Sequence, residues 1–83
     1  MTFASIIVPA FNVQETLAET LRSLLAQTYS GYEIIIVDDG STDASSRIAS
    51  EFLHEPKVRV IRQPNRGLAG ARNTGIAAAK GSA

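Results

Sequence analysis

The chain has 83 residues, of which 45% are hydrophobic and 6% aromatic, so it forms at most one small globular domain. It contains no cysteine, which excludes a disulfide framework and a thiolate metal site. Its apolar stretches are far shorter than the roughly 20 residues that a membrane-spanning helix needs. The N-terminus also lacks the basic start and apolar core of a signal peptide, so we expect a cytoplasmic location.

The net charge is zero, but the charges are separated along the sequence. All eight acidic residues lie at or before Glu55 and six of the eight basic residues lie from Lys57 onward, so segments 1–56 and 57–83 carry formal charges of −6 and +6. The neutral total argues against a general nucleic-acid or membrane-surface binder. The basic segment could attract a compact anion such as a diphosphate, or the opposite charges could pair on a solvated surface.

The N-terminal region predicts a strand followed by a helix. Residues 3–8 are mostly apolar and rich in β-branched side chains, which indicates a strand that ends at Pro9. Asn12 is predicted to cap the next helix, with Glu15 three residues later completing a capping box. The leucines of this helix share one face: Leu17, Leu21, Leu24 and Leu25.

A second strand leads directly into two adjacent carboxylates. The run 34–37 is apolar without alternation, as in a strand that is buried on both faces of a parallel sheet. Asp38 and Asp39 follow it, and Gly40 permits a tight turn. The next residues are all suited to cap a helix: Ser41, Thr42 and Asp43. Carboxylates at this end of a strand lie where open α/β sheets bind ligands, although either one could simply cap the next helix.

The remaining segments complete a β-α-β-α-β-α order. The second helix ends before Pro56 and has its apolar positions at Ile48, Ala49, Phe52 and Leu53. The third strand contains Val58, Val60 and Ile61, with Arg59 pointing to the opposite face. The third helix, 68–80, has its apolar positions at Leu68, Ala71, Gly75, Ile76 and Ala79, and Gly81 ends it. This order predicts an α/β fold with a parallel sheet in three layers.

The chain ends where a fourth strand would be expected. We therefore interpret residues 1–83 as the incomplete N-terminal part of a larger domain. In such a domain the first strand would be interior, so here it would expose an apolar edge, and we expect self-association through that edge or partial unfolding.

Three familiar nucleotide or phosphate motifs do not fit. A dinucleotide-binding Rossmann domain needs G-x-G-x-x-G after the first strand, where residues 9–12 read Pro-Ala-Phe-Asn. A P-loop needs Lys and Ser or Thr where Ile76 and Ala77 stand. A phosphoacceptor receiver needs a further acidic residue after a later strand, and none follows Glu55. Gly70 and Gly75 are better explained by close packing of the third helix on the sheet.

Three segments occur in the right order to suggest a family. They are 5–12 (SIIVPAFN), 32–43 (YEIIIVDDGSTD) and 65–75 (NRGLAGARNTG). Together they closely resemble the N-terminal half of family-2 glycosyltransferases with the GT-A fold, and the resemblance covers nearly the whole chain. It implies transfer of a sugar, with inversion, from a nucleotide-diphosphate sugar to an acceptor hydroxyl. UDP is a common carrier in the family, so we expect a UDP-linked donor. Family members often build cell-envelope polysaccharides and can associate with membranes through other segments.

The resemblance also implies which residues bind the nucleotide sugar: Pro9, Phe11, Glu15, Asp38, Asp39 and Arg72. Pro9 and Phe11 would line the base pocket, and Asp39 would accept a hydrogen bond from the base. Asp38 would support the turn, and Arg72 would approach the base or the diphosphate, to whose oxygens its guanidinium presents several donors. Glu15 could also reach the pocket. His54, Tyr29 and Tyr32 receive no role.

The resemblance places the catalytic machinery beyond Ala83. Family members carry a D-x-D motif at the end of the next strand, which holds Mg²⁺ or Mn²⁺ on the donor diphosphate, and a later carboxylate that deprotonates the acceptor. We therefore expect no catalytic residue, no metal ligand and no transfer activity in these 83 residues alone. Two alternatives stay open: a nucleotide-binding or interaction module without catalysis, and a receiver-like acidic pocket that binds Mg²⁺.

Overall fold

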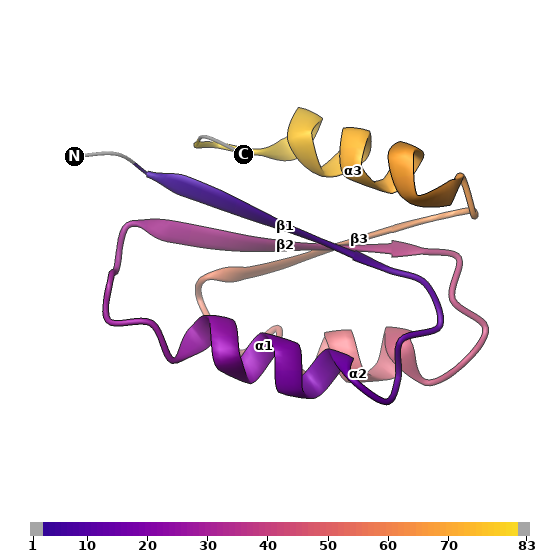
Figure 1. Ribbon diagram of the computed structural model, residues 1–83, viewed down its shortest axis with the longest axis horizontal. Coiled ribbons are helices and arrows are strands. Elements are labelled where there is room, and N and C mark those ends of the chain that lie inside the picture. Colours follow the sequence, from indigo (N-terminus) through magenta and orange to yellow (C-terminus); the bar gives the residue numbers. More distant parts are fainter. Residues whose placement is uncertain (1–2, 82–83) are drawn as a thin grey trace.

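The computed structural model describes residues 3–81 of the chain. Strands and helices alternate along it: β1 (Ala4–Ala10), α1 (Leu17–Leu25), β2 (Tyr32–Asp39), α2 (Ser45–Glu51), β3 (Val58–Gln63) and α3 (Gly67–Ala78). The strands are parallel and lie in the order β1-β2-β3, with β2 in the centre. Helices α1 and α2 cover one face of the sheet and α3 covers the other, which confirms the predicted three-layer α/β order (Figure 1). No helix within residues 3–81 is both long and apolar enough to cross a membrane.

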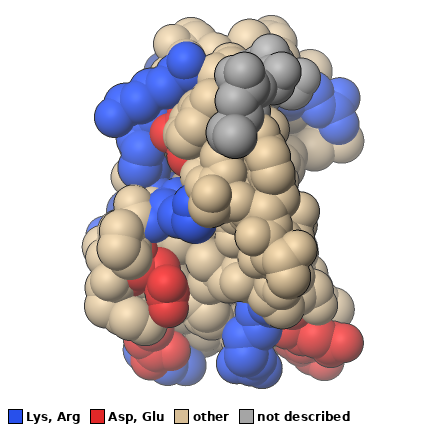
Figure 2. Space-filling model, turned by 90° about the vertical axis from the view of Figure 1, so that its left-hand side faces the viewer, with Lys and Arg blue, Asp and Glu red and all other residues tan. Residues whose placement is uncertain are grey.

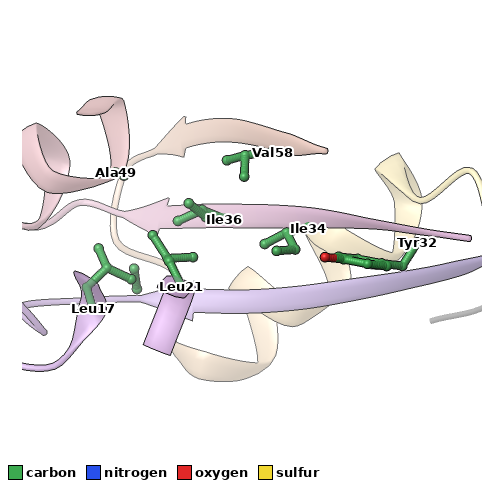
Figure 3. Close-up of a cluster of buried hydrophobic side chains, with 8 residues drawn as sticks. Leu17, Leu21, Tyr32, Ile34, Ile36, Ala49 and Val58 are labelled. Carbon is green, nitrogen blue, oxygen red and sulfur yellow. The ribbon is translucent and has the colours of Figure 1, made fainter. Parts of the chain in front are cut away.

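Strand β2 supplies the centre of the core on both faces. All eight of its residues are buried, as its unbroken apolar run predicted. Ile34 and Ile36 lie in the cluster that contains Leu17 and Leu21 of α1 (Figure 3). The odd-numbered apolar residues of β2 lie in a second cluster, under α3, together with Ala71.

The alternation of side chains along β2 separates its two terminal carboxylates. Because successive side chains of a strand point to opposite faces, Asp38 faces α2 and Asp39 faces α3. Their hydrogen-bond partners agree: the Asp38 carboxylate accepts from Ser46 of α2, and the Asp39 carboxylate accepts from Gly67 of α3. Two neighbours in the sequence therefore belong to two different environments.

The prediction that Pro9 ends the first strand is wrong, because β1 continues to Ala10. The Ala4 N–H donates to the Gly31 carbonyl oxygen at 2.9 Å, so the even-numbered residues of β1 direct their N–H groups toward β2. The nitrogen of Pro9 lies on the other edge of β1, which no strand within residues 3–81 covers. Proline therefore removes no hydrogen bond from the β1–β2 ladder at this position.

The predicted capping box at the start of α1 is also wrong. The helix begins at Leu17, and its N-cap residue, Thr16, makes no side-chain capping hydrogen bond. Asn12 instead has a φ of 53°, in the left-handed region, and its side chain accepts hydrogen bonds from the loop that follows β2. Glu15 is exposed in the turn before α1. Asn12 Oδ1, which the local pattern predicted to cap the helix, therefore accepts hydrogen bonds from residues about 30 positions later in the chain.

Helix α2 is shorter than its apolar pattern predicted. Its N-cap residue is Ala44, so none of the three polar residues before it occupies that position. Asp43 nevertheless accepts a hydrogen bond from the Ser45 N–H at 2.8 Å, which satisfies one of the N–H groups at the helix start. Leu53 lies beyond the end of α2 and is exposed, not packed as predicted.

Helix α3 packs through its smallest residues. Ala71 and Gly75 are buried against the sheet, whereas Leu68 and Ile76, which the helical pattern placed on the packed face, are exposed. A Cβ at Gly75 would lie 2.4 Å from Ile7 Cγ2, so this glycine does permit close packing on β1, as predicted. The same prediction is wrong for Gly70, because a Cβ there would meet the side chain of Arg66, the N-cap residue of α3, and not the sheet.

A buried polar cluster at the amino end of the sheet holds the segment that follows α3. Glu33 accepts hydrogen bonds from Ser5 Oγ at 2.6 Å, the Lys80 N–H at 2.7 Å and Arg59 Nη1 at 3.0 Å. The Gly81 N–H donates to Ser5 Oγ at 2.9 Å. Burial acts to raise the pKa of Glu33, but these hydrogen bonds and the charge of Arg59 together hold that pKa below its ordinary value.

Two basic residues of segment 57–83 lie beside acidic residues of segment 1–56. Arg59 lies 3.0 Å from Glu33, and Arg62 lies 3.9 Å from Asp38. Figure 2, which views the amino ends of the strands, shows basic and acidic side chains near one another and no single charged patch. Of the two interpretations of the charge pattern, pairing of opposite charges is the one that accounts for Arg59 and Arg62.

Candidate functional site

A hollow of about 260 Å³ opens at the carboxyl end of the sheet, between β1 and the start of α3. Its lining comes from the end of β1 and the loop after it, from the last residue of β2, and from the loop before α3 with the first turns of that helix. The lining residues are Pro9, Ala10, Phe11, Val13, Asp39, Asn65, Gly67, Leu68 and Ala71. Ligands of open α/β sheets bind at this edge.

Asp39 is among the residues that line the hollow and is 2% exposed. Its Oδ1 accepts hydrogen bonds from Gln63 Nε2 and from the Arg66 N–H, each at 2.8 Å. Its Oδ2 accepts one hydrogen bond, from the Gly67 N–H at 2.9 Å. The carboxylate thus binds the N-terminus of α3, where the helix dipole favours a negative charge.

These contacts determine the protonation state and the remaining bonding capacity of Asp39. The hydrogen bond from Gln63 lowers the pKa of Asp39, and burial acts to raise it. The N–H groups of Arg66 and Gly67 and the positive charge of Arg66 lower the pKa further. An ionised carboxylate accepts about four hydrogen bonds and donates none. Three positions are filled within the described chain, so Oδ2, with one hydrogen bond, retains one acceptor position on a carboxylate that lines the hollow.

The turn after β2 and the loop after β3 approach each other closely beside Asp39. Gly40 has a φ of 75°, and a Cβ at this position would lie 2.7 Å from the Asn65 backbone nitrogen. Asn65 Nδ2 also donates to the Asp39 backbone oxygen at 3.1 Å. Only glycine combines the left-handed φ with the absence of a Cβ, so Gly40 permits the approach that forms this wall of the hollow.

Asp38 does not line the hollow. Its Oδ1 accepts from the Ser41 N–H at 3.1 Å, which closes the turn after β2, and its Oδ2 accepts from the Ser46 hydroxyl. Arg62 Nε lies 3.9 Å from the same Oδ2, close to the limit for an ion pair. Asp38 therefore binds groups of the turn and of α2.

The structure brings together three of the six residues that the sequence assigned to the nucleotide site. Pro9, Phe11 and Asp39 line one hollow. Arg72 lines a different hollow, beside β1, together with Ser5, Ile6, Ile7 and Ile76. Glu15 is exposed and lines neither hollow, and Asp38 supports the neighbouring turn. The site as described therefore lacks Arg72 and Glu15.

The sequence did not single out the groups that hold Asp39 in place. Gln63 pairs with Asp39 in the register of β2 and β3, so a correct strand register would have found it. The donors from Arg66 and Gly67 are backbone N–H groups, which every residue except proline has, so the residue types do not reveal them. Their one signal was the glycine at the start of α3, which has a φ of 80°.

The residues that the structure describes do not fit a metal ion. Within residues 3–81, no three His, Cys, Asp or Glu side chains are grouped in a way that could hold one. The Asp39 oxygens accept from N–H groups, and the Asp38 oxygens accept from a hydroxyl and an N–H. Both carboxylates therefore already act as acceptors for the protein itself.

Comparison with known proteins identifies the family. A sequence model described as Glycosyl transferase family 2 matches residues 5–83. The chain is 51% identical over 79 residues to the uncharacterized glycosyltransferase EpsJ of Bacillus subtilis (strain 168). This alignment covers 94% of the chain but 23% of EpsJ, so the chain spans about a quarter of that relative's length.

Solved structures show the same fold. The crystal structure of TarS from S. aureus in complex with UDP matches with a TM-score of 0.84 and 28% identity, over 98% of this chain and 25% of that one. The mannosyltransferase PcManGT from Pyrobaculum calidifontis, in complex with GDP-Man and Mn²⁺, matches with a TM-score of 0.87 and 27% identity. The latter match covers 96% of this chain and 25% of that one.

Proposed function

The chain belongs to glycosyl transferase family 2, and on that premise we propose that it supplies the nucleotide-binding half of a longer glycosyltransferase. This enzyme would transfer a sugar, with inversion, from a UDP-sugar to an acceptor hydroxyl. The observation that carries the proposal is the carboxylate of Asp39, whose Oδ2 accepts one hydrogen bond from the described chain and which lines a hollow at the carboxyl edge of a parallel sheet.

The bonding capacity of Asp39 supports uracil as the base. Uracil presents one ring N–H between two carbonyl groups, so it needs a single acceptor. Guanine presents two adjacent N–H donors, and a carboxylate that binds both must have a free position on each oxygen. In this structure Oδ1 already accepts two hydrogen bonds and only Oδ2 has room.

The other walls of the hollow suit a flat ring. Phe11 is 47% exposed and offers an aromatic face, and Pro9 and Ala71 are apolar. Stacking of a base on an aromatic side chain contributes about 1–3 kcal/mol. The base would therefore be held by ring contacts at Phe11 and oriented by its N–H at Asp39.

The solved neighbours support a nucleotide diphosphate as the ligand, since TarS was crystallised with UDP and PcManGT with GDP-Man. The Mn²⁺ in PcManGT is consistent with a divalent metal, Mg²⁺ or Mn²⁺, in the complete enzyme. Because residues 3–81 do not offer a metal site, its ligands would come from elsewhere in that enzyme. We accordingly expect the 83-residue chain to bind nucleotide but not to transfer sugar.

The location and the product of the enzyme are also part of the proposal. We expect the enzyme to act in the cytoplasm, where nucleotide sugars are available to it, and to build a polysaccharide. Should the longer protein lack acidic metal ligands after α3, the non-catalytic nucleotide-binding module becomes the better assignment. A transfer assay of the longer protein with a UDP-sugar, alongside the 83-residue chain, separates the two.

The base preference can be tested by titrating the isotope-labelled chain with UDP and with GDP, each with and without Mn²⁺. We expect amide shifts near Phe11, Asp39 and Gly67 with UDP, and at least about tenfold weaker binding of GDP, because one hydrogen bond to a charged acceptor is lost. Equal binding of the two nucleotides would contradict uracil selection. Shifts that need Mn²⁺ but no nucleotide would favour the acidic-pocket alternative.

A further inference from the structure

The loop after β1 and the loop after β2 are joined by a set of hydrogen bonds centred on Asn12. Asn12 Oδ1 accepts from the Thr42 N–H at 2.8 Å and from the Asp43 N–H at 3.3 Å. In the opposite direction, the Asn12 N–H donates to Ser41 Oγ at 3.2 Å. One residue of the first loop therefore binds three consecutive residues of the second.

The backbone of Asn12 makes this arrangement specific to its side chain. Its φ of 53° lies in the left-handed region, which asparagine and aspartate tolerate better than other residues with a Cβ. A short side chain with a carbonyl oxygen is also required to reach two successive N–H groups. Glycine would meet the first requirement but not the second, so the two contributions can be separated by substitution.

The anchors of this network lie on both sides of Phe11. The Ser41 hydroxyl donates to the Ala10 carbonyl oxygen at 3.3 Å and accepts from the Asn12 N–H, so it binds the residues before and after Phe11. Phe11 itself is half exposed and lines the hollow that contains Asp39. Its position thus depends on the backbone that Ser41 and Asn12 hold.

We propose that Asn12 is a positioning residue that holds Phe11 in place in the lining of the hollow that Asp39 shares, so that a base can contact both. The inference rests on the proposed nucleotide function of the hollow. Asn12 does not itself line the hollow. It acts through Phe11, by fixing the loop to the turn that directly follows Asp39.

A matched control is available in the same pair of loops. Gln14 Oε1 accepts from the Ala44 N–H at 2.9 Å, so Gln14, like Asn12, joins the two loops through a side-chain oxygen. Gln14 does not flank Phe11 and does not line the hollow. Gln14→Ala therefore removes a similar loop contact without releasing the residue that we expect to meet the base.

The test is a double-mutant cycle on UDP affinity, measured by calorimetry on the full-length protein that carries this chain, with thermal unfolding of each variant. We expect Asn12→Gly to weaken UDP binding about three- to tenfold and Gln14→Ala to weaken it less than about twofold. Asn12→Asp, which keeps the acceptor oxygen, should retain most of the affinity for UDP. In a Phe11→Ala background Asn12→Gly should cause no further loss, because its effect passes through Phe11.

Each outcome decides the inference. If Asn12→Gly lowers UDP affinity in the unaltered protein but not in the Phe11→Ala background, the result supports the positioning role. If Asn12→Gly lowers UDP affinity equally with and without Phe11, Asn12 has a structural role and the inference is overturned. The same holds if UDP affinity falls in step with the unfolding temperature in both Asn12→Gly and Gln14→Ala. If the unaltered protein does not bind UDP, the proposed function fails first; if it binds UDP and Asn12→Gly binds equally well, the inference about Asn12 alone fails.

Discussion

The Gly67 N–H donates to Asp39 Oδ2 at 2.9 Å, so the last residue of β2 binds the first residue of α3. The same carboxylate accepts the Arg66 N–H at 2.8 Å. Asp39 therefore stabilises the helix N-terminus and also retains the acceptor position that we assign to the base. Its orientation is set without a ligand, which reduces the entropy that binding must overcome.

Substitution of Gly75 tests the packing of α3 on β1. We expect Gly75→Ala to lower the free energy of unfolding by about 1–3 kcal/mol, because the new Cβ would lie 2.4 Å from Ile7 Cγ2. Alanine's higher helix propensity acts in the other direction by about 1 kcal/mol. Urea denaturation measures the difference. In an Ile7→Ala background the loss should shrink or reverse, and an undiminished loss there would show that the clash with Ile7 is not its cause.

The lowered carboxylate pKa values predict sensitivity to acid. The pKa values of Glu33, Asp39 and Asp43 all lie below their ordinary values of 4.5, 3.8 and 3.8. For Asp43, burial acts to raise the pKa, but hydrogen bonds from Ser45 and the Gln14 N–H more than offset it. A carboxylate with a lowered folded pKa contributes stability that is present above its unfolded pKa and disappears as the pH falls through the folded one.

Urea midpoints measured from neutral pH downward should therefore be nearly constant until about pH 5 and then fall. Glu33→Gln should be less stable at neutral pH, because the charge-assisted hydrogen bonds from Arg59 and Lys80 are weakened, and should lose less stability on acidification. An acid slope in Glu33→Gln as steep as in the unaltered chain would show that Glu33 contributes nothing to it.

Arg72 provides a test of where the phosphates lie. It lines the hollow beside β1, one position after Ala71, which lines the Asp39 hollow. If Arg72 meets the diphosphate, Arg72→Ala should weaken UDP binding about tenfold or more and leave uridine binding unchanged, because uridine carries no phosphate. Arg47→Ala, which removes an exposed arginine paired with Glu51 on α2, is the control. Equal losses for UDP and uridine would place Arg72 at the base or in a structural role.

The edge of β1 away from β2 predicts self-association. Within residues 3–81 no strand covers it, and the half-exposed Ile76 lines a hollow with Ile6 and Ile7 of β1. We expect sedimentation velocity to show a concentration-dependent dimer or larger species of the 83-residue chain. Ile76→Lys, at an exposed helix position, should reduce it. A monomeric sample with a single cooperative melting transition would contradict this expectation.

The sequence was sufficient for the elements whose signal is local. The apolar run before Asp38 predicted a strand buried on both faces, and the alternation of strands and helices predicted a parallel sheet, because both depend on residues adjacent in the chain. The prediction that the first strand ends at Pro9 was wrong because the effect of proline depends on which edge of the strand its nitrogen faces. That edge follows only from the strand order. The gathering of Pro9, Phe11 and Asp39 in one hollow could be expected because parallel strands end at one edge.

Long-range polar pairs could not be predicted. Asn12 has the same local pattern whether it caps α1 or binds Thr42, and only the folded loop places the Thr42 N–H within reach. Glu33 and Ser5 are 28 residues apart, and nothing in the sequence near either one indicates the pair. Backbone donors such as the Gly67 N–H carry no residue signature at all.

The most direct test of the central claim compares two carboxylates of one strand. Asp39 and Glu33 lie at opposite ends of β2 and are 2% and 5% exposed, respectively, so Asp39→Asn and Glu33→Gln both neutralise a buried acceptor. Calorimetric titration with UDP should show an affinity about tenfold or more lower for Asp39→Asn, and nearly unchanged for Glu33→Gln. Unaltered affinity in Asp39→Asn, or an equal loss in both variants, would contradict base recognition by Asp39.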